Sequence, residues 1–314
     1  MVKAIATLTM NPAIDMSASV AHVAPEIKLR CNPPRRDPGG GGINVARAIR
    51  RLGGDVVAVY PSGGLTGQLL QDLLDREALR HQPIPIEEIT RENVTILDEN
   101  TGQQYRFGMP GPQLDDAEWQ RCLDAVAGLS PAPDYLVASG SLPAGAPTDF
   151  FARAAALART LGARLVLDTS GEALKQAVEN GGVYLLKPNM RELSQLAGRR
   201  IEDEAHQEEV ALQLVRSGKA EVVVVSLGAA GALYATREGC ERLRAPTVPI
   251  QSKIGAGDSM VGGMVLSLAR GDALRDAVRF GVAAGAAAVM TPGTDLCRRE
   301  DVERLYRQMA GVAA

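Results

Sequence analysis

One segment of the sequence combines glycines with an acidic residue in a pattern suited to anion chemistry. Residues 254–260 read IGAGDSM and lead into an apolar helical pattern. Gly255, Ala256 and Gly257 would let several backbone N–H groups converge on one point, where the helix dipole adds positive potential. Asp258 would stand close enough to take a proton from a hydroxyl that attacks a phosphoryl group. A tight turn with an aspartate in the first helical turn is the plainer alternative, because Asp is favoured at helix starts.

A second glycine-rich segment opens another helical pattern. Residues 38–44 read PGGGGIN. Four consecutive glycines cost backbone entropy, so we expect the backbone to approach a ligand closely here. The segment is not the dinucleotide fingerprint, since no G-x-G-x-x-G occurs there and no strand pattern precedes it. A flexible loop is the alternative.

Two strand patterns end in residues suited to a nucleotide and its metal. Residues 185–192 read LLKPNMRE, in which Lys187, Asn189 and Glu192 suit phosphate and Mg²⁺, an ion that takes few carboxylates plus waters. A proline turn with Asn189 capping the next helix is the alternative. Residues 222–231 read VVVVSLGAAG, and their small residues would let a nucleotide lie against backbone, although glycine-rich turns are common.

Basic residues gather in two polar segments of the first third of the chain. They are Lys28, Arg30, Arg91 and Arg106, with Asp15 nearby in the sequence. Cations above an active site would suit an anionic substrate, and solvated surface charges are the alternative.

The composition excludes several classes of protein. The 314 residues carry a formal net charge of −3 with a pI of about 5.8, so we expect no nucleic-acid partner. No stretch approaches the ~18 apolar residues of a membrane span, and no secretory signal is expected. The four cysteines lie far apart without a CxxC or a nearby histidine, which favours a reducing cytoplasm over a disulfide or zinc site.

The elements that must position these residues alternate along the chain. Six short runs are continuously apolar, as buried parallel strands are, and helical patterns separate them. The runs are residues 4–9, 56–60, 135–139, 164–168, 183–187 and 221–226. This repetition predicts a doubly wound, mostly parallel α/β sheet with helices on both faces, which binds ligands at the carboxyl ends of its strands.

Residues 14–37 and 86–109 break the alternation. They contain short polar-alternating runs at 16–20, 27–31, 93–98 and 104–108, and a turn at 99–102 predicts a hairpin between the last two. We expect both segments to form a small β-sheet lid on a single domain that spans residues 1–314.

Together these segments resemble the ribokinase-like (PfkB) sugar kinase family, and within it the minor 6-phosphofructokinase (isozyme 2) group of enteric bacteria. The resemblance runs almost end to end. The segments that carry it are residues 38–49, 102–111, 139–143, 168–174, 187–193, 223–233, 255–260, 279–288 and 293–297.

The resemblance implies transfer of phosphate from ATP to a sugar phosphate, with Asp258 as the base and the amides of Gly255, Ala256 and Gly257 as the anion hole. It implies Mg²⁺ held by Asn189 and Glu192, and an ATP site lined by Lys187, Ser226, Gly228 and Gly231. Sugar hydroxyls would meet Asp15, Gly40, Gly41 and Asn44. The sugar's phosphate would meet Arg91, Lys28, Arg30 and Ser139. The lids of two subunits pack together in the family, which implies a homodimer in which some basic lid residues serve the neighbouring site.

Three departures from the family pattern bear on cation and substrate. Lys253 stands where Thr or Ser is usual, so it would supplant or weaken K⁺ activation, and Asp295 replaces a basic residue with the opposite effect. Residues 11–15, NPAID, resemble 1-phosphofructokinase and tagatose-6-phosphate kinase. We expect phosphorylation of fructose 6-phosphate to fructose 1,6-bisphosphate in glycolysis. Those two kinases are the nearest alternatives, and a non-catalytic sugar-phosphate sensor is the alternative of another class.

Overall fold

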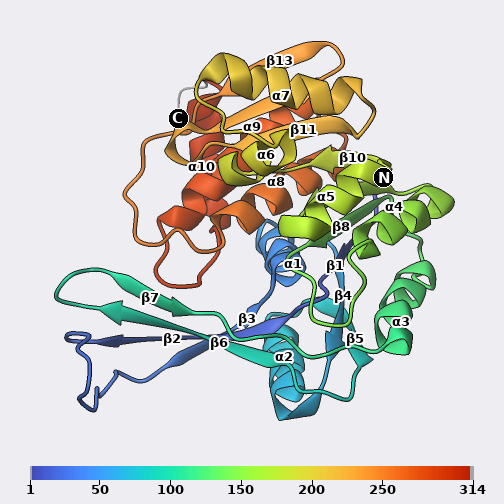
Figure 1. Ribbon diagram of the computed structural model, residues 1–314. Coiled ribbons are helices and arrows are strands. Elements are labelled where there is room, and N and C mark those ends of the chain that lie inside the picture. Colours follow the sequence, from blue (N-terminus) through green and yellow to red (C-terminus); the bar gives the residue numbers. More distant parts are fainter. Residues whose placement is uncertain (1, 312–314) are drawn as a thin grey trace.

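Two sheets organise the computed structural model, which describes residues 2–311 (Figure 1). The larger sheet has nine strands in the order β13-β12-β11-β10-β9-β8-β1-β4-β5. Their bounds are β1 (Ile5–Leu8), β4 (Val57–Ser62), β5 (Arg80–Pro85), β8 (Tyr135–Ser139), β9 (Arg164–Asp168), β10 (Val183–Leu186), β11 (Ala220–Ser226), β12 (Ala232–Thr236) and β13 (Gly239–Leu243). Strands from β11 to β5 in this order run parallel, and β12 and β13 add an antiparallel edge. All six apolar runs form strands of this sheet, which confirms the expected α/β class.

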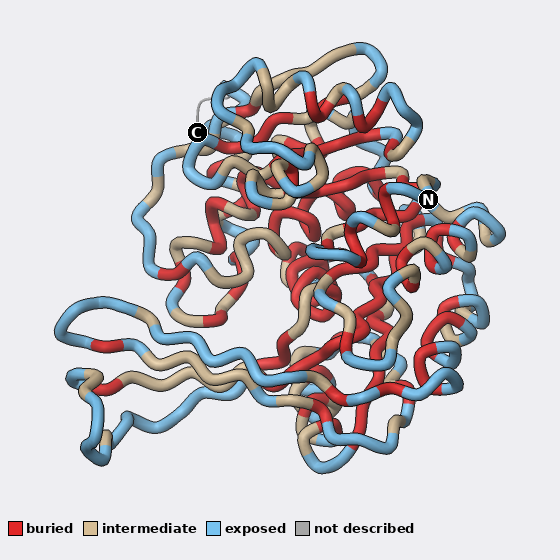
Figure 2. Tube along the Cα trace, in the orientation of Figure 1, coloured by how far each residue is buried: buried red, intermediate tan, exposed pale blue. Residues whose placement is uncertain are grey.

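Two hydrophobic cores cover the two faces of the large sheet. Figure 2 shows the buried residues running through the body of the molecule, with exposed residues toward its surface and along the small sheet. Successive strand residues alternate between the two cores, as the pleat requires: Ile5 and Val137 face one core, while Ala6 and Leu136 face the other. The first core is closed by α1 (Gly41–Arg51), α2 (Gly64–Arg76), α8 (Ala256–Arg270), α9 (Leu274–Val289) and α10 (Arg299–Met309). The second is closed by α3 (Asp116–Ala127), α4 (Phe150–Leu161), α5 (Gly171–Asn180), α6 (Met190–Ala197) and α7 (Glu204–Arg216).

The smaller sheet extends away from the body of the molecule (Figure 1). Its order is β3-β2-β6-β7, with β2 (Ala13–Val20), β3 (Arg35–Gly39), β6 (Arg91–Asp98) and β7 (Gln104–Phe107). The turn at 99–102 joins β6 and β7 into an antiparallel hairpin, as expected.

Two expectations about the segment before α1 are wrong. Residues 27–31 form no strand, because this stretch lies exposed in the loop between β2 and β3, without the buried face that makes alternation a strand signal. A strand does precede the glycine run: β3 pairs with β2 from Arg35 to Gly39. Its Arg and Pro content conceals it in the sequence.

Helix α4 ends at Gly162 in the left-handed conformation, with φ of 70°, which favours glycine. Asp149 occupies its N-cap position, yet its side chain accepts a hydrogen bond from Arg153 and caps nothing. Within residues 2–311, no helix is both long and apolar enough to cross a membrane.

Candidate active site

The carboxyl ends of the central strands bring polar side chains to one edge of the large sheet. Ser139 ends β8, Asp168 ends β9, and Lys187 follows β10 directly. Asn189 pairs with Ser226 across the ends of the next two strands. In a parallel sheet, this edge is where ligands bind.

The N-terminus of α8 opens at the same edge. Gly255 is its N-cap residue with φ of 74°, a left-handed conformation that favours glycine. In the described part of the chain, no side chain caps this helix. The N–H groups of its first turn therefore lack the partners that a capping side chain would supply, and they are available to an anion.

Asp258 lies in that first turn and meets a residue from α1. The Asn44 Nδ2 atom donates a hydrogen bond to Asp258 Oδ2 over 2.9 Å. Burial, together with the negative charge of Asp168, raises the pKa of Asp258 to about 7, against the opposing effects of Asn44 and Lys187. A carboxyl with such a pKa can exchange a proton near neutral pH.

Lys187 supplies the cation of the site. Its side chain is 5% exposed, and Nζ lies 3.2 Å from Asp168 Oδ1. A Cβ atom at Gly257 would lie 3.8 Å from Nζ, so the ammonium stands beside the first turn of α8. Burial works to lower the pKa of Lys187, but Asp168, Glu192 and Asp258 outweigh it and the pKa is raised. The lysine therefore stays charged.

The Asn189 side chain caps α6, as the alternative for this residue expected. Its Oδ1 accepts from the Glu192 N–H at 3.0 Å, and a Glu192 carboxylate oxygen accepts from the Asn189 N–H at 2.8 Å. This capping box fixes Glu192 with one oxygen, Oε1, left outside the box. Burial raises the pKa of Glu192.

Mg²⁺ fits this donor set when a nucleotide accompanies it. Among residues 2–311, no cluster of three or more His, Cys, Asp or Glu side chains could hold a metal alone. Asp168 nevertheless lies 3.2 Å from the Lys187 ammonium, and the negative charges of Glu192 and Asp258 act on the same ammonium. Mg²⁺ commonly binds through one or two carboxylates, substrate phosphates and water.

The glycine run packs against the protein's own side chains, so the flexible-loop alternative is wrong. Gly39 ends β3, Gly40 is the N-cap of α1 with φ of 108°, and Gly41 begins the helix. A Cβ atom at Gly41 would lie 2.5 Å from Ser139 Oγ, and one at Gly39 would collide with the Asp15 carboxylate. Glycine is thus what lets α1 begin beside Asp15 and Ser139.

Asp15 on β2 is held by a residue that sequence reasoning missed. Asn93 Nδ2 donates to Asp15 Oδ1 at 2.8 Å, and Asn93 Oδ1 accepts from the Met109 N–H at 3.2 Å. Burial raises the pKa of Asp15, although this hydrogen bond and the charges of Arg91 and Arg47 oppose the shift. Asn93 carries no sequence signal of its own, because its role depends on the β2–β6 register.

Arg91 lies on the neighbouring strand opposite Ala13, two residues from the partner of Asp15, and its charge acts on Asp15. It donates to the Met109 carbonyl at 3.1 Å and to the Asn11 carbonyl at 3.0 Å. Its buried Nε atom has no partner among the described residues. Burial lowers the pKa of Arg91, and Asp15 opposes that shift.

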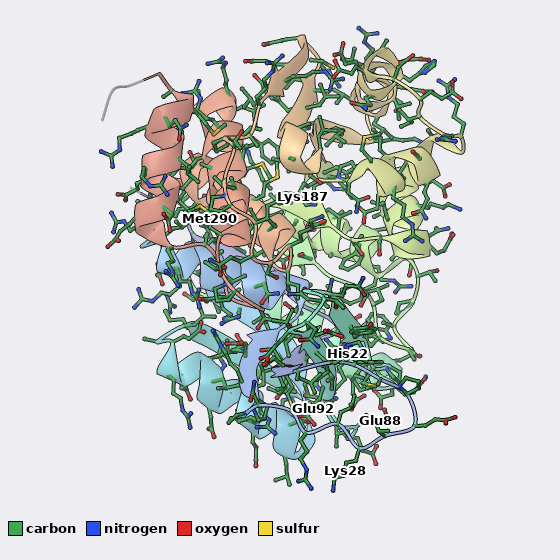
Figure 3. All side chains as sticks on the ribbon, turned by 90° about the vertical axis from the view of Figure 1, so that its left-hand side faces the viewer. His22, Lys28, Glu88, Glu92, Lys187 and Met290 are labelled. Atoms are coloured by element: carbon green, nitrogen blue, oxygen red, sulfur yellow. The ribbon has the colours of Figure 1, made fainter. Side chains whose placement is uncertain are left out.

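Four other predicted residues lie apart from this cluster or have structural roles. Lys28 and Arg30 are exposed in the loop beyond β2, and Figure 3 shows Lys28 well separated from Lys187. Gly228, with φ of 60°, faces open space after β11. Gly231 has φ of 97°, and a Cβ atom there would collide with the Leu243 carbonyl oxygen, so the turn itself requires glycine.

Asp168 is a further residue that sequence reasoning gave no role. It is the last residue of a predicted strand, so the rule that ligands gather at carboxyl ends was a signal that could have found it.

Asp295 and Lys253, two of the departures from the family pattern, differ in their surroundings. Asp295 accepts a hydrogen bond from Arg51 at 2.5 Å and lies 3.6 Å from Arg35. Lys253 is exposed and pairs with no acid among residues 2–311.

The family model described as "pfkB family carbohydrate kinase" matches residues 5–301. The chain is 47% identical over 306 residues to the ATP-dependent 6-phosphofructokinase isozyme 2 of Mycobacterium tuberculosis H37Rv, covering 98% of this chain and 90% of the relative. It is 43% identical to the isozyme 2 of Escherichia coli K12, covering 97% and 98%. The 1-phosphofructokinase of Bacillus subtilis 168 is 32% identical, with 96% and 97% covered.

A crystal structure of Escherichia coli phosphofructokinase-2 in complex with potassium superposes on the chain with a TM-score of 0.94 at 42% identity. It covers 98% of this chain and 99% of that one. The family model and these relatives cover nearly the whole chain. The chain therefore belongs to the pfkB family of carbohydrate kinases.

Proposed function

We propose that this chain is an ATP-dependent 6-phosphofructokinase that converts fructose 6-phosphate to fructose 1,6-bisphosphate. The observation that carries the proposal is Asp258, a carboxyl of raised pKa at the uncapped N-terminus of α8, oriented by Asn44 and beside Lys187. The identity to two isozyme 2 enzymes supports the choice of acceptor.

In the proposed mechanism, Asp258 takes the proton of the acceptor hydroxyl as that oxygen attacks the γ-phosphoryl group. The N–H groups of Gly255, Ala256 and Gly257 and the ammonium of Lys187 hold the negative charge of the transferring group. The protein does little covalent chemistry itself, since catalysis of phosphoryl transfer depends on positioning and charge stabilisation.

The nucleotide would lie along the ends of β10 and β11. Lys187, Ser226, Gly228 and Gly231 would line the ATP site, and Asn189 and Glu192 would hold Mg²⁺, directly or through water. The bound ion would neutralise phosphate charge. Asn189 Oδ1 already caps α6, so we propose that Glu192 is the main protein ligand of the metal ion.

The acceptor would lie between the lid and the amino end of α1. Asp15, Gly40, Gly41 and Asn44 would bind its hydroxyls, and Arg91 and Ser139 its phosphate. Lys28 and Arg30 are exposed in the loop between β2 and β3, and we propose that they reach the site of a second copy. Tyr105, Phe107 and Met109 expose apolar surface on the lid, and pairing of two lids would cover it.

The test is a panel of sugar phosphates with coupled detection of ADP. We expect fructose 6-phosphate to give the highest kcat/KM. Preference for fructose 1-phosphate or tagatose 6-phosphate would establish one of the two alternative kinases on the same fold. Binding of sugar phosphate without release of ADP would establish the sensor.

The potassium in the Escherichia coli crystal structure motivates a second comparison. We propose that Lys253 weakens K⁺ activation in this chain, and a comparison of turnover in K⁺ and Na⁺ buffers tests this proposal.

We also propose a cytoplasmic location, because the described cysteines are all unpaired.

A further inference from the structure

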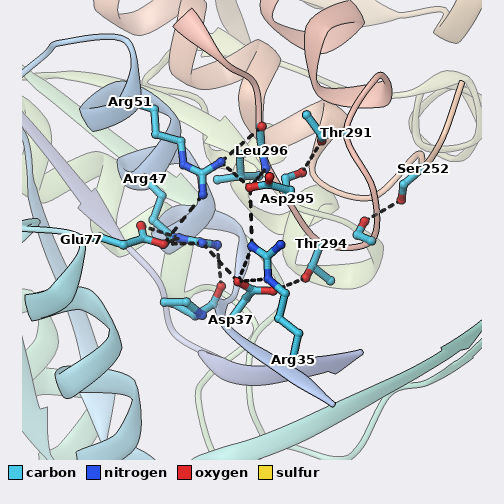
Figure 4. A network of polar contacts seen from close by, with 12 residues as sticks. Arg35, Asp37, Arg47, Arg51, Glu77, Ser252, Thr291, Thr294, Asp295 and Leu296 are labelled. Carbon is cyan, nitrogen blue, oxygen red and sulfur yellow. Dashed lines mark hydrogen bonds and ion pairs between the residues drawn. The ribbon is translucent and has the colours of Figure 1, made fainter. Parts of the chain in front are cut away.

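Arg47 is a fully buried cation one helical turn after Asn44 on α1, and Figure 4 shows it beside Glu77 and Asp37. Its Nε and Nη2 atoms donate to the two carboxylate oxygens of Glu77 at 2.9 and 2.6 Å. Its Nη1 atom donates to the Pro38 carbonyl at 2.9 Å and lies 3.4 Å from Asn44 Oδ1. Burying a guanidinium is costly even when it is paired, so the position of this charge calls for a reason beyond stability.

The reason lies in the two ends of the Asn44 amide. Its Nδ2 atom faces the Asp258 carboxylate, and its Oδ1 atom faces the Arg47 guanidinium. If the amide were turned over, its oxygen would face a carboxylate and its NH₂ group would face a cation. Both contacts would then be repulsive, so the charge of Arg47 and the charge of Asp258 favour the same orientation.

We propose that Arg47 is a positioning residue that acts through Asn44, holding its amide so that Nδ2 donates to Asp258. The inference rests on the proposed function of Asp258 as the base. Glu77 holds the guanidinium in place from the end of α2, and the Pro38 carbonyl holds it from the lid strand β3. Pro38 pairs with Ile14, the neighbour of Asp15, so the same guanidinium joins the base to the sugar side of the site.

The first test compares Arg47→Met with Arg50→Met. Arg50 lies on the same helix, is exposed, and donates to the Ala78 carbonyl beside Glu77, which makes it a matched control. We expect Arg47→Met to lower kcat about tenfold, the worth of one hydrogen bond to a charged group, with the KM for ATP unchanged. The acid limb of its pH profile should move to higher pH, because a looser Asn44 lowers the pKa of Asp258 less.

The second test is a double-mutant cycle with Asn44→Ala. If Arg47 acts through Asn44, Arg47→Met should lower kcat no further in the Asn44→Ala background. Independent, multiplied effects would overturn the inference, as would a folded Arg47→Met with the kcat and pH profile of the wild type. A merely structural role would lower the melting temperature and leave both unchanged.

Arg47→Met leaves Glu77 without its main partner and can destabilise the fold, so a second variant controls for this effect. The double variant Arg47→Met/Glu77→Met removes the ion pair together, and it should show the same change in kcat and pH profile. Wild-type turnover separates this inference from the function on which it rests. If the wild-type protein is inactive with every sugar phosphate, the proposed function is refuted. If the wild type is active but Arg47→Met leaves kcat and the pH profile unchanged, only the role of Arg47 is refuted.

Discussion

Asn44 Nδ2 lies 2.9 Å from Asp258 Oδ2, although 214 positions of the chain separate the two residues. The contact depends on how closely α1 and α8 pack. A Cβ atom at Gly262 would lie 2.9 Å from Ala48 Cβ and 3.1 Å from the Val45 carbonyl oxygen, so glycine permits this approach. The amino ends of both helices consequently open toward one site, one with the base and the other with its hydrogen-bond donor.

The pH profile of the wild-type enzyme should report the base. Because burial raises the pKa of Asp258 to about 7, we expect kcat/KM for the sugar phosphate to fall below that pH in the free enzyme. Initial rates from about pH 5.5 to pH 8.5 measure it, with the coupling enzymes kept in excess. A profile that is flat across this range would contradict the assignment.

Asp258→Asn should change stability in a pH-dependent way. The folded protein keeps a proton on Asp258 that the unfolded chain releases near 3.8. The stabilisation that protonated Asp258 contributes is therefore fully present below about pH 3.8 and is lost as the pH rises through about 7. Asparagine does not titrate, so the variant should gain in free energy of unfolding relative to wild type between about pH 5 and pH 8. Urea unfolding at both pH values tests this, and an unchanged difference would count against the raised pKa.

Gly41→Ala should damage both the fold and acceptor binding. Its Cβ atom would lie 2.5 Å from Ser139 Oγ and 2.7 Å from the Gly140 nitrogen. We expect a loss of about 1–3 kcal/mol in the free energy of unfolding, typical of overpacking, and a higher KM for the sugar phosphate. Gly128→Ala is the control, since the nearest atom to its Cβ would be 3.5 Å away and φ is −84°. Equal stability of the two variants would contradict the packing account.

Local sequence patterns sufficed for the elements that carry strong periodicity. The apolar runs predict the parallel strands because both faces of that sheet are buried, and the glycines before Asp258 predict an open helix start. They did not suffice for β3, because its residues from Arg35 to Gly39 show no apolar alternation, although Asp37, Pro38 and Gly39 are buried. Asn93 was also beyond them, because only the pairing of β2 with β6 brings it to Asp15. Arg47 lies one helical turn from Asn44, but its burial and its ion pair with Glu77 depend on the tertiary fold.

Arg91→Ala should chiefly raise the KM for the sugar phosphate. The buried Nε atom of Arg91 has no hydrogen-bond partner within residues 2–311, and the charge of Asp15 acts on this side chain, so an anionic acceptor would supply the missing hydrogen bond. We expect an increase of about tenfold or more, with a smaller change in kcat, since loss of one charge-assisted contact acts mainly on binding. Arg121→Ala is the matched control, because Arg121 is an exposed arginine that also donates to a backbone carbonyl. A KM that matches the control would remove Arg91 from the acceptor site.

The role of Asp258 as the base is tested most directly by the turnover of Asp258→Asn with fructose 6-phosphate and ATP. General-base catalysis contributes about 10²–10⁴-fold, so we expect kcat to fall by that factor while circular dichroism and ATP binding match the wild type. Asparagine keeps the shape of the side chain and can still meet Asn44, so the loss would report the proton acceptor itself. A folded Asp258→Asn enzyme that turns over within about tenfold of wild type would contradict the account.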